Sequence, residues 1–117
     1  MTSPRFTGSG QVAIAGYAHS PITRHIDEPL GTLTVRTALE AIADAGLSVA
    51  QMDGFTTGAI FPSSGGRTIV DGVHIVTADW LVEQLGIRPR WLCGFQGVGQ
   101  IPGSVILAAT AIATGAA

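Results

Sequence analysis

The sequence predicts an α/β fold in which a mostly parallel β-sheet is covered by helices, and three observations support this prediction. Apolar runs alternate with segments of helical periodicity in the order strand, helix, strand, helix, strand, helix. Residues typical of helix caps stand at the ends of the helical segments. Apolar residues make up 46% of the 117 residues and charged residues only 12%, against about 25% in an ordinary soluble domain.

Three short runs are predicted to form the strands. Residues 11–17 (QVAIAGY) are apolar between glycine-rich flanks, which is typical of a buried strand. Residues 55–60 and 91–96 are predicted as the second and third strands. Residues 61–72 are rich in glycine and serine and are predicted to form a loop. Residues 97–103 are rich in glycine and are predicted to form a turn.

The first helix is predicted over residues 32–45. Val35, Leu39 and Ile42 recur at intervals of four and three residues, which places them on one helix face. Gly46 stands where a C-terminal cap belongs. A single short turn is expected after it, because Ser48 and Gln51, three residues apart, have the spacing of a capping box.

The second helix is predicted to start at Thr77 or Asp79, either of which can cap it, and to run through Leu85. Gly86 ends this helix and Pro89 prevents its return. The last helix is predicted over residues 104–114, followed by a glycine as its stop.

The scarcity of charge predicts that much of the surface is buried against more chain or a second subunit. The sequence also stops directly after a helix, where a further strand is expected. We therefore expect residues 1–117 to form one incomplete domain.

Composition excludes several function classes. The net charge is −2, with six arginines and no lysine, so no clustered basic face for nucleic acid is expected. Arg88 and Arg90 form the one close basic pair; a solvated loop pair is predicted, with phosphate binding as the alternative. Cys93 is the single cysteine, which rules out an internal disulfide and fits a reducing cytosol, so a cytoplasmic protein is expected.

No membrane span is expected, although residues 91–117 carry no charge. Gln96, Gln100, Pro102 and several glycines interrupt this stretch, and its purely apolar part is shorter than the roughly 20 residues that a span requires. The N-terminus is polar and does not resemble a targeting segment.

The glycine-rich turn before the last helix is the most informative part of the chain. A helix N-terminus favours anions and developing oxyanions, and glycines let a substrate approach the backbone. Dinucleotide binding is one reading, because Gly97-Val98-Gly99 begins like G-x-G-x-x-G. Against it, Pro102 occupies the third glycine position and no acidic residue follows Glu83.

A second reading comes from a family resemblance that covers nearly the whole chain. Four segments carry it: VAIAGYAHSPITR, TLTVRTALEAIADAGLSVAQMDGF, ADWLVEQLGIRPRW and ILAATAIATG. Together they resemble the N-terminal part of the thiolase superfamily, in particular its sterol-carrier-protein and lipid-transfer-protein branch. The resemblance implies a thiolase-like N-terminal βαβαβα layer.

Thiolases carry their nucleophilic cysteine at the start of the last of these helices, followed by glycine and small residues. Counting back from Gly115 without gaps, the equivalent position is Val98, followed by Gly99. Valine cannot form a thioester, so covalent acyl transfer is not expected there. Cys93 lies five residues earlier and is predicted to be a buried strand residue, with a role as nucleophile as the alternative.

The resemblance therefore implies a lipid-transfer-protein type aldolase, which cleaves a β-hydroxyacyl-CoA by a retro-aldol step in lipid or steroid degradation. The acid and base would lie beyond residue 117, and the segment itself would bind no cofactor, CoA being part of the substrate. An acyl-CoA acetyltransferase using Cys93 and a non-catalytic thiolase-like subunit are the alternatives. The residues expected to line the acyl-thioester site, with the backbone at Gly99 stabilising an oxyanion, are Gln96, Gly97, Val98, Gly99 and Gln100.

By the same resemblance, a homodimer and a small zinc-ribbon/OB-fold partner protein are expected. The resemblance also implies that the sheet of residues 1–117 keeps an open edge, so the isolated chain is expected to be insoluble or tightly associated. No metal site is expected, because His19, His25 and His74 fit no metal-binding spacing. Adjacent Asp27 and Glu28 resemble a catalytic carboxylate pair, but a solvated loop pair is the simpler prediction.

Overall fold

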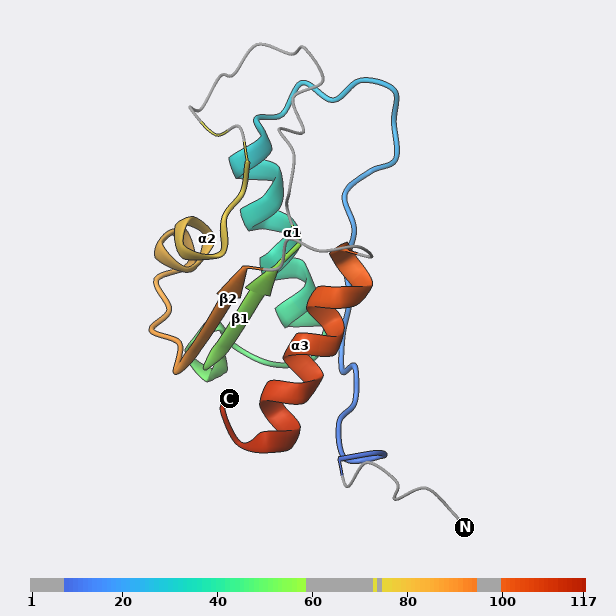
Figure 1. Ribbon diagram of the computed structural model, residues 1–117. Coiled ribbons are helices and arrows are strands. Elements are labelled where there is room, and N and C mark those ends of the chain that lie inside the picture. The colour runs from blue at the N-terminus through green and yellow to red at the C-terminus, as the bar shows by residue number, and fades with distance from the viewer. Residues whose placement is uncertain (1–7, 59–72, 74, 95–99) are drawn as a thin grey trace.

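The computed structural model of the chain describes residues 8–58, 73, 75–94 and 100–117. Its described elements are three α-helices, one short 3-10 turn and two β-strands (Figure 1). In chain order they are α1 (Leu30–Asp44), η1 (Val49–Gln51), β1 (Gly54–Thr57), α2 (Ala78–Leu85), β2 (Trp91–Gly94) and α3 (Gln100–Thr114).

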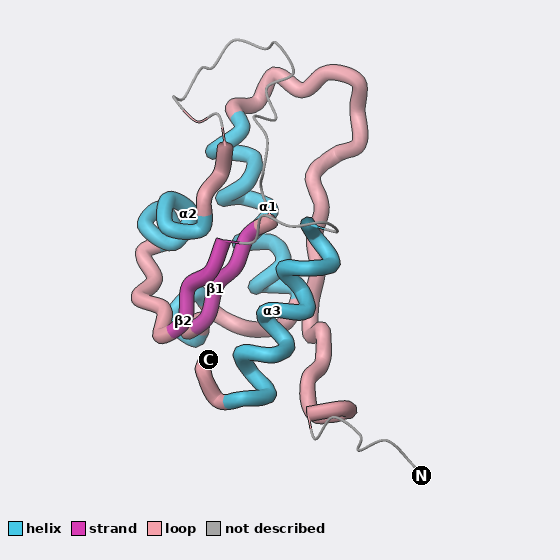
Figure 2. The backbone as a smooth tube through the Cα atoms, in the orientation of Figure 1, coloured by secondary structure: helices cyan, strands magenta, loops and turns pink. Residues whose placement is uncertain are grey.

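The two strands are parallel, which confirms the predicted α/β class (Figure 2). Gly54 lies opposite Trp91 and Thr57 opposite Gly94, so all four residues of each strand are paired. Parallel neighbours need a crossover connection, and α2 lies within it. α3 packs against β1, α2 contacts both strands, and α1 packs against α2.

α1 ends where its sequence predicts, at a glycine in the left-handed conformation. Gly46 has φ 70°, which a residue with a side chain rarely adopts. Its N–H donates to the carbonyl of Ala43 (2.9 Å), and Leu47 N–H donates to that of Ile42 (3.1 Å). These two bonds make a Schellman cap. The predicted turn beyond it also forms, with Gln51 Oε1 accepting from Ser48 N–H at 2.9 Å.

α2 is capped at both ends as predicted. Thr77 Oγ1 accepts a hydrogen bond from Trp80 N–H (3.4 Å), and Gly86 ends the helix with φ 67°. Hydrogen bonding by the Thr77 side chain, and then by backbone N–H groups, lowers the pKa of the Asp79 carboxyl. The buried apolar residues of the described chain gather mainly around this helix: Val76, Ala78, Leu81, Val82, Ile87 and, from α3, Ala111.

Residues 11–17 do not form the predicted strand. They have no strand assignment, and Ile14 is 81% exposed. A strand is held by pairing with a neighbour, and this segment is tied instead to the end of α1. Tyr17 N–H donates to Asp44 Oδ2 (3.0 Å), and the Cα of Gly16 packs against the backbone of Ala45.

α3 begins at Gln100, four residues earlier than predicted, so residues 100–103 are helix and not turn. Pro102 is tolerated because the first four N–H groups of a helix have no partner within it. Gly115, with φ 77°, ends the helix as predicted. Within the described residues, no helix is long and apolar enough to cross a membrane.

The structure tests some of the predicted boundaries of the second and third strands. β1 starts one residue before the prediction and ends at Thr57, and Gly58 is outside it. β2 starts at the predicted Trp91. The remaining predicted strand residues, 59–60 and 95–96, lie outside the described residues.

We predict that Gly16→Ala lowers the free energy of unfolding by about 1–3 kcal/mol, the usual cost of overpacking. A Cβ at this position would lie 2.5 Å from Ala45 N and 2.8 Å from Ala41 O, both backbone atoms. Gly94→Ala is the matched control, because a Cβ there meets nothing within 4 Å. Denaturant unfolding of both variants measures the difference. Equal stabilities would contradict the close packing of this segment on α1.

Candidate functional site

The site expected from the sequence lies between β2 and α3. Gln100 is the first residue of α3, and β2 ends at Gly94. Gln96, Gly97, Val98 and Gly99 lie outside the described residues, so the acyl-thioester site stays a prediction. What the described elements establish is that the segment 95–99 joins the carboxyl end of a parallel strand to a helix N-terminus.

Cys93 is a strand residue, as predicted, but it is only half-buried. It lies opposite Thr56 of β1. Its thiol makes one weak contact, to the carbonyl oxygen of Gly94 at 3.7 Å. A nucleophilic cysteine is normally activated by a neighbouring base or cation, and none of the described contacts of Cys93 is of that kind.

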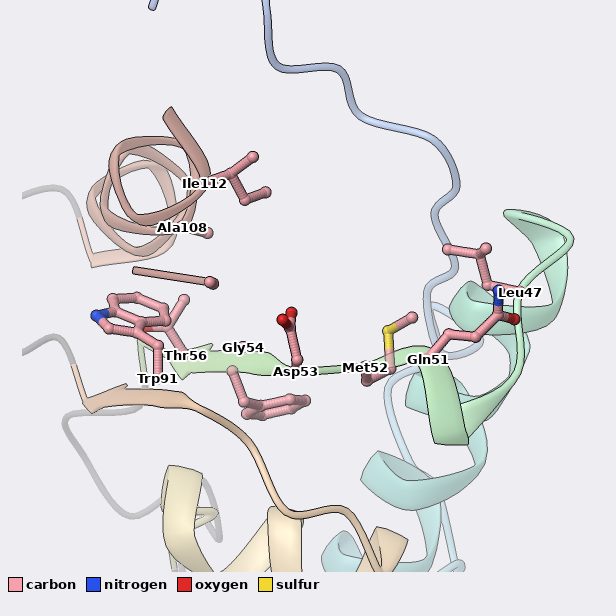
Figure 3. Close-up of a pocket in the computed structure, with 11 residues that line it drawn as sticks. Leu47, Gln51, Met52, Asp53, Gly54, Thr56, Trp91, Ala108 and Ile112 are labelled. Carbon is pink, nitrogen blue, oxygen red and sulfur yellow. The ribbon is translucent and has the colours of Figure 1, made fainter. Parts of the chain in front are cut away.

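An apolar cleft of about 270 Å³, which the sequence did not reveal, opens between α3 and the segment from η1 to β1. Figure 3 shows Ala108 and Ile112 of α3 on one side of it, with Leu47, Gln51 and Met52 across the opening. The cleft forms between segments that are distant in the sequence, so no local sequence motif predicts it. Its lining residues are Leu47, Gln51, Met52, Asp53, Gly54, Phe55, Thr56, Trp91, Ala108, Ile112 and Ala117.

The carboxylate of Asp53 points into this opening in Figure 3. Arg90 lies beside it, with Nη1 3.6 Å from Asp53 Oδ2, while Nη2 donates to the carbonyl oxygen of Gly115 (3.3 Å). The backbone N–H groups of Arg90 and Trp91 both donate to the Asp53 carbonyl. Arg90 therefore joins the start of β1 to the end of α3. Because both charged side chains are largely exposed, the ion pair itself adds little stability.

Thr56 is one of the residues that line the cleft. Its Oγ1 is buried and has no hydrogen-bond partner among the described residues. The neighbouring edge of β1 is also open, since within the described chain β1 pairs with β2 alone. The cleft is lined mainly by apolar groups.

Two of the remaining candidate residues have structural partners. Glu28 Oε2 lies 2.9 Å from Arg36 Nη2, and Glu28 is largely shielded, so it is not the solvated acid that was predicted. The Nδ1 atom of His19 lies 2.8 Å from the Ser20 carbonyl oxygen. His74 is outside the described residues. The described side chains contain no group of three or more that could hold a metal ion.

The described part of the chain therefore offers a binding surface and not a catalytic constellation. The cleft can hold an apolar group, with the carboxylate of Asp53 at its opening to orient it. No nucleophile and base lie within hydrogen-bond distance of each other among these residues.

Comparisons with known proteins found no match for this chain. No family model matches the chain, and neither a curated protein nor a solved structure does.

We predict that Thr56→Val raises the free energy of unfolding by about 1 kcal/mol, because it removes a buried hydroxyl without a partner at nearly constant shape. Thr37→Val is the matched control: its hydroxyl donates to the Leu33 carbonyl (2.8 Å), so the same change should not stabilise the chain. Thermal and denaturant unfolding measure both. Destabilisation by Thr56→Val would mean that this hydroxyl has a partner in solution.

Proposed function

We propose that the chain is the N-terminal portion of a thiolase-fold enzyme that acts on acyl-CoA thioesters. The reaction proposed is retro-aldol cleavage of a β-hydroxyacyl-CoA in lipid or steroid side-chain degradation. The observation that carries the proposal is the passage from a parallel strand, β2, through a glycine-rich segment, to a helix of small residues, α3. In thiolases this passage bears the nucleophile, and here the resemblance puts Val98 in its place.

The described ends of β2 and α3 suit such a site physically. Ligands of parallel α/β sheets bind outside the carboxyl ends of the strands, where segment 95–99 begins. α3 adds the free N–H groups and positive dipole end of its first turn. Such groups can stabilise the thioester oxygen as negative charge develops during carbon–carbon cleavage. The backbone at Gly99 is proposed to contribute in the same way.

The open edge of β1 supports the finer proposal of a thiolase-like layer. A two-stranded sheet is rarely stable alone, and parallel sheets are normally larger. The apolar cleft beside that edge gives a further strand an apolar surface to cover. We therefore propose that β1 and β2 belong to a wider βαβαβα layer of an incomplete domain.

The surroundings of Cys93 favour the aldolase over an acetyltransferase. Thiolysis requires an activated thiolate, and the one hydrogen bond of this half-buried thiol among the described residues goes to a backbone carbonyl. Retro-aldol cleavage needs no thiolate, only an acid and a base, which are proposed to lie outside this sequence. The proposal also includes CoA as part of the substrate, assembly as a homodimer and binding of a zinc-ribbon/OB-fold partner protein.

A non-catalytic thiolase-like subunit is the second candidate. The observation in its favour is that the described residues include no nucleophile–base pair while the chain exposes large apolar side chains, among them Ile101 and Ile106. A subunit that serves only to bind a partner would have these properties.

The test is a steady-state assay of the complete product of the gene that encodes this chain, with the partner protein supplied. We expect a β-hydroxyacyl-CoA with a tertiary alcohol to release a ketone at a rate that Cys93→Ala leaves unchanged. Val98→Trp, which fills the proposed site, should abolish this activity. Ile22→Trp is the matched control, because Ile22 is 94% exposed.

The outcomes separate the candidates. Thiolysis of a β-ketoacyl-CoA that Cys93→Ala abolishes would overturn the aldolase proposal and identify an acetyltransferase. Inactivity toward both substrates, with the partner present, would favour the non-catalytic subunit.

A further inference from the structure

We draw no further inference here: the strongest candidate, the apolar cleft between α3 and the segment from η1 to β1, lies beside the open edge of β1 that a further strand is already proposed to cover, and nothing in the structure shows what else occupies it.

Discussion

The parallel pairing of β1 with β2 is the interaction on which the rest of the described structure depends. Parallel strands must be buried on both faces, since their crossover places helices there. α2 lies within the crossover and contacts both strands, and α3 packs against β1. In the part of the chain that the structure describes, four residues of each strand are paired, so the sheet presents little surface for helices to cover. A small sheet therefore limits how many apolar side chains can be buried.

That limit explains several features together. Among the described residues only a few apolar side chains are buried, mostly around α2, although nearly half of the chain is apolar. Other apolar side chains are exposed at the surface, among them Ile14 of the N-terminal segment and Ile101 and Ile106 of α3. Apolar side chains also line the cleft beside the open edge of β1. Each of these is a place where further protein can remove apolar surface from water.

Several of the charged side chains have structural roles. Arg90 bridges Asp53 and the end of α3, and Arg36 holds Glu28. These charged side chains already have structural partners. The proposed activity therefore relies on backbone groups at the start of α3 and on residues outside this sequence.

Local sequence by itself determined the helices and most of their ends. The caps at Gly46, Thr77, Gly86 and Gly115 were predictable because their hydrogen bonds and backbone angles involve residues only a few positions apart. Tertiary structure decided the rest. Residues 11–17 have a strand's composition but no strand partner, Glu28 is shielded by an arginine eight residues away, and the cleft joins segments more than 50 residues apart. Such features depend on which distant segments meet, and no local pattern encodes that choice.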